Sequence, residues 1–148
     1  MNLYLLNALI MPFETKKNEI ATFIAQKITQ DRYQEILTLA LKEKSNIKSY
    51  IGHHSTVEFL KEILPSELKD LIKYNRGHLY LKEGDMALVF RITERGDILK
   101  EHSFEELMNF YKKGKFEFVL ISRVYAPEVV LNPSNYFKKG GVIWILKN

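Results

Sequence analysis

The chain has 148 residues, 46% of them hydrophobic, which is enough for one domain with a sizeable core. Its 22 Lys and Arg against 18 Asp and Glu give a net charge of +4, which suits an anionic partner without requiring one. The absence of cysteine excludes disulfides and thiolate metal sites and favours a cytoplasmic location.

The first part of the chain is expected to alternate strands and helices. Residues 3–10 form a nearly continuous apolar run, too short to span a membrane, which predicts a strand buried on both faces. Residues 20–25 are expected to form a second strand, antiparallel to the first. Thr29 is placed to cap the next helix, whose apolar face has helical spacing: Tyr33, Ile36, Leu37, Ala40 and Leu41. A polar loop at residues 42–46 is expected to end that helix.

Residues 49–56 place an imidazole beside a glycine just before another predicted helix. Ser55 and Glu58 have the spacing of a capping box, and Pro65 is expected to end the helix. His53 should then lie just outside the helix N-terminus, where unpaired N–H groups and the helix dipole favour a phosphate. Gly52 would let that phosphate approach the main chain, and His53 would transfer a proton beside it. The alternative is an ordinary loop before a helix cap.

A short helix over residues 66–73 and a turn at residues 74–77 are expected to lead into a hairpin, with residues 78–82 and 86–93 as its strands. Alternation in the second strand puts Leu88 and Phe90 on one face and Arg91 on the other. If the strand continues, Arg95 joins the Arg91 face, and two guanidiniums then suit a phosphate or a stacked base. The alternative is a pair of solvated arginines at a strand end.

The last part of the chain has a second capping box at Ser103 and Glu106, and Gly114 is placed as the C-terminal cap of that helix. Strands are expected over residues 115–124 and 142–146. Together these elements predict an α/β (α+β) fold in a single domain, with a small mixed β-sheet of about five to six strands flanked by helices.

Several chemistries lack their sequence motifs. There is no Walker loop, no G-x-G-x-x-G and no G-x-S-x-G. His53 and His54 are adjacent and tend to point apart, while His78 and His102 are isolated, so no metal site and no cofactor are expected.

Several short boxes occur in the order found in the small viral and cellular ring nucleases, the family of the type III anti-CRISPR protein of archaeal viruses. The boxes are Leu3-Tyr4-Leu5-Leu6-Asn7-Ala8, Ile51-Gly52-His53-x-Ser55-Thr56, Asn75-Arg76, Glu83-Gly84-Asp85, Arg95 and Tyr111-Lys112-Lys113-Gly114-Lys115-Phe116. The chain resembles that family from residue 1 to about residue 122. Residues 1–122 are therefore interpreted as a ring-nuclease-like domain, and residues 123–148 as a C-terminal extension packed on it.

The resemblance implies a small mixed sheet flanked by helices and a two-fold homodimer. It implies binding of cyclic tetra-adenylate, the messenger that activates type III CRISPR ancillary nucleases, with no membrane and no duplex DNA as partner. The family cleaves the ring without a metal, leaves linear oligoadenylates with 2′,3′-cyclic phosphate ends, and so switches off the response. A viral member would act in the host cell cytoplasm.

The resemblance also assigns residues. His53 matches the catalytic histidine of the family and Arg95 an arginine at its active site. Six further residues are expected to bind the substrate, either from this resemblance or from the phosphate chemistry of the helix start and the arginines. They are Asn7, Gly52, Ser55, Arg76, Arg91 and Asp97.

Three positions depart from the family pattern. Arg91 stands where the family commonly has glutamine, which adds charge and would alter ring preference. The acidic segment after the active-site arginine is shortened to Gly96-Asp97, which leaves Asp97 as the candidate for the family's glutamate. His54 replaces the usual aspartate, as either a second proton-transfer group or a solvated loop residue.

The chemistry of the residues agrees with a ring nuclease. A ribose 2′-hydroxyl attacks its own 3′-phosphate, so the protein needs only to align the atoms, neutralise charge and protonate the leaving oxygen. His53 would be the general acid and Arg95 would stabilise the phosphorane. Two alternatives remain: a non-catalytic protein that sequesters the cyclic nucleotide, and a small basic DNA-binding regulator for which the +4 charge is the only support.

Overall fold

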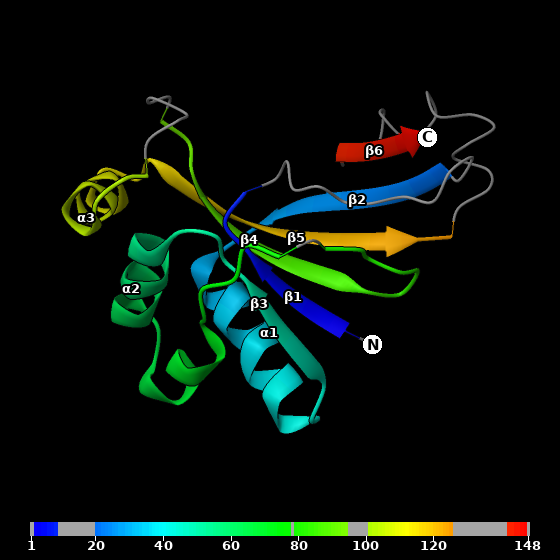
Figure 1. Ribbon diagram of the computed structural model, residues 1–148, viewed down its shortest axis with the longest axis horizontal. Coiled ribbons are helices and arrows are strands. Elements are labelled where there is room, and N and C mark those ends of the chain that lie inside the picture. Colours follow the sequence, from blue (N-terminus) through cyan, green and yellow to red (C-terminus); the bar gives the residue numbers. More distant parts are fainter. Residues whose placement is uncertain (1, 9–19, 78, 95–100, 126–141, 148) are drawn as a thin grey trace.

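The computed structural model describes residues 2–8, 20–77, 79–94, 101–125 and 142–147. These residues form one mixed sheet with helices, which confirms the predicted single-domain α/β fold (Figure 1). Its elements are β1 (Asn2–Leu6), β2 (Ile20–Ile28), α1 (Gln30–Lys42), β3 (Asn46–Tyr50), α2 (His54–Ile63), the 3₁₀-helix η1 (Ser66–Leu71), β4 (Met86–Ile92), α3 (Phe104–Lys112), β5 (Phe116–Val124) and β6 (Val142–Lys147).

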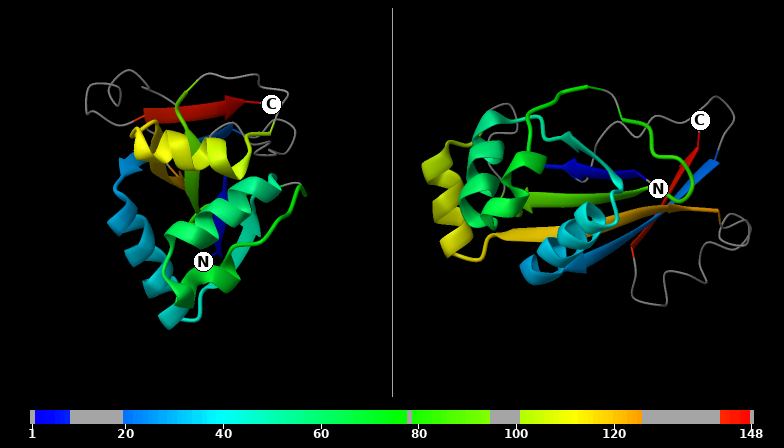
Figure 2. Two further views of the ribbon diagram at one scale, coloured as in Figure 1. Left: turned by 90° about the vertical axis from the view of Figure 1, so that its left-hand side faces the viewer. Right: turned by 90° about the horizontal axis from the view of Figure 1, so that it is seen from below.

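The sheet has six strands in the order β3-β1-β4-β5-β2-β6. β1 runs parallel to both β3 and β4, whereas β5 runs antiparallel to β4 and β2, and β6 antiparallel to β2. The helices gather on one side of the sheet, and α3 lies beside α2 at one end of it (Figures 1 and 2). β6 extends the sheet beyond β2, so the C-terminal strand is part of the same sheet.

Strand alternation divides the core into two clusters. The cluster between sheet and helices includes Leu5, Leu88 and Phe90 from the strands with Tyr33 and Phe59 from the helices. The cluster on the other face contains the alternate strand residues: Tyr4, Leu6, Phe23, Ala25, Ala87, Val89, Val119 and Ile121. β1 and β4 are therefore buried on both faces. Burial on both faces was predicted for the first strand from the apolar run at residues 3–10, although β1 ends at Leu6.

Several predicted helix signals are confirmed. Thr29 caps α1, with its side-chain oxygen accepting from the Arg32 backbone N–H at 3.1 Å. Ser103 and Glu106 form the predicted capping box, and Gly114 follows α3 with a φ of 71°. Leu41 is an exception, because it is 43% exposed and does not belong to the buried face of α1.

The predicted pairing of the second strand was wrong. β2 runs in the same direction as β1 and is separated from it by β4 and β5. Both hydrogen-bonding edges of β1 are already occupied by β3 and β4, so β2 has no edge of β1 to pair with. β3 itself was missed because its sequence, Asn-Ile-Lys-Ser-Tyr, is polar and gives a weak strand signal at the edge of the sheet.

The hairpin expected before β4 was also wrong. Both edges of β4 are taken, by β1 and β5, which leaves the preceding segment no edge of β4 to pair with. Leu79 and Leu81 instead pack on the second face, and Arg123 donates a hydrogen bond to the Leu81 carbonyl. Asp85 fixes the end of this segment by accepting from the backbone N–H groups of Lys82 at 3.0 Å and Asn2 at 3.1 Å. His78 and residues 9–10 of the first expected strand lie outside the described residues.

The buried tyrosine of α1 allows a test of the core. Tyr33 is fully buried, and its hydroxyl has no hydrogen-bond partner among the described residues. Burial raises the pKa of Tyr33. Tyr33→Phe is expected to raise the free energy of unfolding by about 1 kcal/mol, measured by urea denaturation at pH 7, because an unsatisfied hydroxyl is removed. Above about pH 10, the stability of the wild type should also fall more steeply than that of Tyr33→Phe, because Tyr33 ionises in the unfolded chain but stays neutral in the folded protein.

Tyr111→Phe is the matched control. The Tyr111 hydroxyl donates to the Gln30 side-chain oxygen, so its removal is expected to lower stability by about 1 kcal/mol. Equal effects of the two substitutions would contradict an unsatisfied Tyr33 hydroxyl.

Candidate active site

The N-terminus of α2 lies at the end of β3. Ile51 forms an isolated parallel bridge with Tyr74, and the chain then passes through Gly52 to His53 at the N-cap. The His53 carbonyl accepts from the Val57 backbone N–H at 3.2 Å, but its side chain makes no capping hydrogen bond. The imidazole therefore stands at the helix N-terminus without serving as a cap.

The predicted capping box at Ser55 and Glu58 was wrong, because the helix begins two residues earlier, with His53 as its N-cap residue, and a distant carboxylate bonds to Ser55 in the first turn. Glu101 accepts hydrogen bonds from the Ser55 backbone N–H at 3.0 Å and from the Ser55 hydroxyl at 2.9 Å. The Ser55 N–H, helped by the Ser55 hydroxyl and the charges of His53 and His54, lowers the pKa of Glu101. A carboxylate of the chain thus occupies the position at which the sequence predicted a phosphate.

A pocket of about 270 Å³ opens beside His53. It lies where the carboxyl ends of the parallel strands β1 and β4 meet the N-termini of α2 and α3, a usual place for ligand sites in α/β proteins. Its lining residues are Asn7, Ala8, His53, Thr56, Phe90, Arg91, Ile92, His102 and Leu107. Of the predicted site residues, Asn7, His53 and Arg91 are therefore brought together.

Asn7 also connects the pocket to the loop before α2. Its side-chain oxygen accepts from the Gly52 backbone N–H at 3.1 Å. A methyl group added at Gly52 would lie 3.5 Å from Cγ of Arg76 and 3.9 Å from Oδ1 of Asn7. Gly52 and Arg76 thus lie beside Asn7, although neither lines the pocket.

Arg91 is half-buried and paired. Its Nε donates to Glu117, which lies opposite on the antiparallel strand β5. Lys27 Nζ is 4.0 Å from the second oxygen of the same carboxylate. Arg91 thus lies one residue from the end of β4 with 39% of its side chain exposed, and part of its charge is balanced by Glu117. The other two predicted residues, Arg95 and Asp97, lie outside the described residues.

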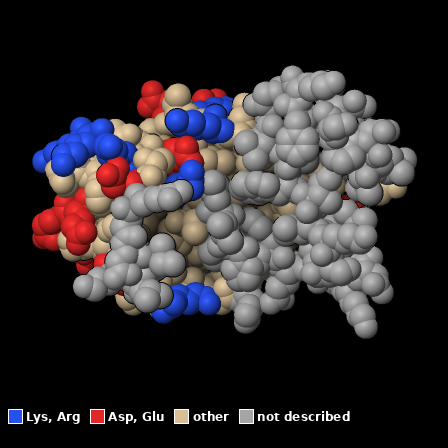
Figure 3. Space-filling view, turned by 90° about the horizontal axis from the view of Figure 1, so that it is seen from above, with Lys and Arg blue, Asp and Glu red and all other residues tan. Residues whose placement is uncertain are grey.

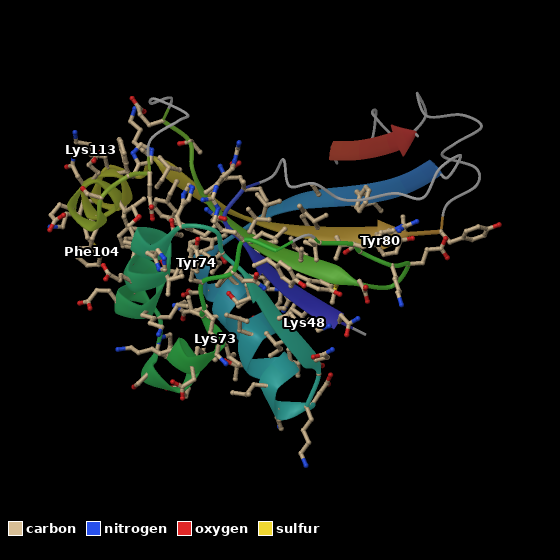
Figure 4. All side chains as sticks on the ribbon, in the orientation of Figure 1. Lys48, Lys73, Tyr74, Tyr80, Phe104 and Lys113 are labelled. Atoms are coloured by element: carbon tan, nitrogen blue, oxygen red, sulfur yellow. The ribbon has the colours of Figure 1, made fainter. Side chains whose placement is uncertain are left out.

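His54 takes a different direction from His53. Its ring stacks on Tyr74 with the centroids 3.7 Å apart and the planes 13° apart, and Tyr74 is labelled in Figure 4. His54 is not among the residues that line the pocket. The structure thus separates the two adjacent imidazoles, as the sequence led us to expect.

Sequence reasoning missed two residues of this region, Glu101 and His102. His102 lines the pocket, and its Nδ1 lies 3.3 Å from Oε2 of Glu106. The spacing of His102 and Glu106, four residues apart across a predicted helix start, was the available signal. Nothing local in the sequence indicated that Glu101 contacts Ser55.

Acidic and basic side chains both gather at the end of the molecule that carries α3, on the described surface seen in Figure 3. Among the residues that the structure describes, no group of three or more His, Asp or Glu side chains is placed to hold a metal ion. No helix in the described part of the chain is long and apolar enough to cross a membrane.

The cap of α2 is testable by stability. Glu101→Ala is expected to lower the free energy of unfolding at pH 7 by about 0.5–1 kcal/mol. This loss lies in the lower part of the range for a lost N-terminal cap, because Glu101 is exposed to solvent. Because the folded-state pKa of Glu101 is lowered, its charge-dependent contribution is present above the unfolded value and disappears as the pH falls through the folded one. Urea denaturation at pH 7 and about pH 3 measures both effects.

Glu58→Ala is the control, because Glu58 belongs to the capping box that does not form. We expect this variant to change stability by less than about 0.5 kcal/mol. A larger loss than in Glu101→Ala would contradict the assignment of the cap.

Comparisons with known proteins agree with this fold. The chain is 33% identical over 76 residues to the uncharacterized protein ORF116 of Acidianus filamentous virus 1, a match that covers 51% of this chain and only 61% of the viral protein. It is similar in structure to B116 of Sulfolobus turreted icosahedral virus, with a TM-score of 0.54 and 24% identity over 82% of this chain and 99% of that one, which supports the fold alone. The model of the STIV B116-like family matches residues 3–118. The chain therefore belongs to the STIV B116-like family, which includes proteins of archaeal viruses.

Proposed function

We propose that the protein is a metal-independent ring nuclease that opens cyclic tetra-adenylate and so switches off type III CRISPR signalling. The observation that carries the proposal is the pocket at the α2 N-terminus, where the imidazole of His53 is not used as a cap and lies with Asn7 and Arg91. The order of the sequence boxes shared with ring nucleases supplies the identity of the substrate.

The reaction needs no nucleophile from the protein. The 2′-oxygen of one adenosine attacks the adjacent phosphorus, the bond from phosphorus to the 5′-oxygen breaks, and a 2′,3′-cyclic phosphate remains. His53 gives its proton to the departing 5′-oxygen, a role worth roughly 10²–10⁴-fold in rate. Arg91, and in the family resemblance Arg95, stabilise the negative charge that develops on the phosphate.

A phosphate bound at Ser55 would exchange with Glu101. Both hydrogen bonds that Glu101 accepts come from Ser55, one from the backbone N–H at the start of α2 and one from the hydroxyl. An anion of the substrate would use the same donors, so its binding displaces the Glu101 carboxylate into solvent. We propose this exchange as the way in which Ser55 contributes to substrate binding.

Two copies of the chain are needed to hold the ring. Pockets for single drug-sized ligands have volumes of about 300–1,000 Å³, and the pocket of about 270 Å³ is below that range. A ring of four nucleotides is larger than such a ligand, so one pocket accommodates only part of it. We propose a two-fold homodimer that presents the pocket twice to the repeated phosphates.

Incubation of the purified protein with labelled cyclic tri-, tetra- and hexa-adenylate in EDTA tests the activity. The wild type is expected to convert the tetramer to linear products with 2′,3′-cyclic phosphate ends, identified by mass spectrometry. His53→Ala should lose roughly 10²-fold or more in single-turnover rate while it still binds the ring. His54→Ala is the matched control and should cleave nearly as the wild type does.

The other outcomes separate the alternatives. Tight binding of a ring that stays intact would show that the protein sequesters the nucleotide without cleaving it. Failure to bind any ring would exclude cyclic oligoadenylates as the substrate. Affinity for duplex DNA that falls steeply with salt would then favour a DNA-binding regulator.

Gly52→Ala tests the approach of a phosphate to the main chain. Its added methyl group makes only ordinary contacts, at 3.5 Å from Arg76 and 3.9 Å from Asn7, so the fold should tolerate it. We expect stability equal to the wild type or up to about 1 kcal/mol higher, together with several-fold weaker binding of cyclic tetra-adenylate. Thermal unfolding and equilibrium binding measure the two effects, and unchanged affinity would remove Gly52 from the binding site.

A further inference from the structure

We propose that His102 is the general base of the reaction, removing the proton from the 2′-hydroxyl that attacks the phosphorus. This inference rests on the proposed function and adds a second catalytic residue to it. No sequence pattern assigned a role to His102, and the proposal comes from its position in the pocket.

The pocket brings two imidazoles to one space from two different elements. His53 is the N-cap of α2, and His102 immediately precedes Ser103, the N-cap of α3. α2 and α3 pack against each other, and both histidines line the same pocket of about 270 Å³. A phosphodiester in that pocket would therefore share it with two side chains of the type that transfers protons at neutral pH.

The environment of His102 is that of a base. Its Nδ1 lies 3.3 Å from Oε2 of Glu106, and its ring meets the Phe110 ring edge-on, with the centroids 5.2 Å apart and the planes at 75°. In the tautomer that donates from Nδ1 to this carboxylate, Nε2 on the other side of the ring keeps its lone pair and is able to accept a proton. The side chain is 27% exposed, so solvent reaches it to remove the proton after turnover.

Glu106 is itself fixed in this position. Its Oε1 accepts from the Ser103 backbone N–H at 3.3 Å in the capping box, while Oε2 faces His102. The Ser103 N–H, followed by the hydrogen bond from His102, lowers the pKa of Glu106. Glu106 therefore remains a carboxylate at neutral pH and acts as the positioning residue for His102.

The two histidines differ in their contacts, and we assign their roles on that difference. One nitrogen of the His102 ring faces the Glu106 carboxylate at 3.3 Å, which leaves Nε2 to accept a proton. His53 stands at the start of α2 and makes no capping hydrogen bond, so its ring is left to donate a proton. The reaction then balances: the 2′-hydroxyl proton goes to His102 Nε2, the new bond forms between the 2′-oxygen and phosphorus, and the His53 proton goes to the leaving 5′-oxygen. Exchange with water restores both imidazoles.

The pH dependence of cleavage is set by the groups around the pocket. Glu106 from α3 contacts the His102 ring, Arg91 from β4 and His53 from α2 line the same pocket, and Glu101 is next to His102 in the chain. A neutral base and a protonated acid together give a bell-shaped rate profile in the wild type. Removal of the base should abolish the low-pH limb of that profile, and removal of the acid should abolish the high-pH limb.

Single-turnover cleavage of cyclic tetra-adenylate by His102→Ala tests the base. The rate is expected to fall roughly 10²-fold or more with little change in ring affinity, and the low-pH limb of the profile should disappear. Added imidazole should restore part of the rate. Glu106→Gln, which keeps the capping box, should lower the single-turnover rate to an intermediate value while ring affinity and stability stay unchanged.

A modified substrate distinguishes base from acid. When sulfur replaces the bridging 5′-oxygen, the leaving thiolate needs no proton, so His53→Ala should regain most of its activity whereas His102→Ala should not. Normal cleavage and an unchanged pH profile in His102→Ala would overturn this inference and leave the proposed function intact. A wild-type protein that leaves the ring whole would overturn both.

Discussion

β1 forms hydrogen bonds with two strands at once and runs parallel to both of them. Because β3 and β4 pair in the same direction, the ends of β1 and β4 open at one edge of the sheet, close to the start of α2. Burial on both faces keeps β1 in this central position, with Leu5 against the helices and Leu6 on the opposite side. Asn7 follows directly and joins the strand end to the loop that carries His53. The position of the pocket thus depends on the parallel pairing of one short strand.

Charges around the pocket are balanced within the chain. Glu117 pairs with Arg91, and Glu101 accepts from the start of α2. These contacts satisfy groups that would otherwise be unpaired. Under the proposed function, a substrate phosphate that binds at Ser55 exchanges with the Glu101 carboxylate instead of adding to an empty group of donors.

The proposed acid and base occupy comparable places in the fold. His53 occupies the N-cap position of α2 without bonding to the helix, and His102 lies one residue before the N-cap of α3, so each helix start carries one imidazole that lines a shared pocket. The capping box of α3 has a second consequence, because the Glu106 side chain that completes it also orients His102. A local stability element and the proposed proton acceptor are thus built from the same carboxylate. This connection explains why a substitution of Glu106 is expected to affect the rate without removing the base.

Local patterns in the sequence determined the elements of this protein. Apolar alternation identified β4 and β5, the Thr29 and Ser103 caps set the starts of α1 and α3, and Gly-His before an apolar helix pattern placed His53 at the start of α2. Only the tertiary structure decided that β2 pairs with β5, that residues 79–82 leave the sheet, and that Glu101 and His102 reach α2 and the pocket. Caps and periodicity act over a few residues, whereas these contacts depend on which strand edges and helix ends remain unoccupied once the whole chain has folded.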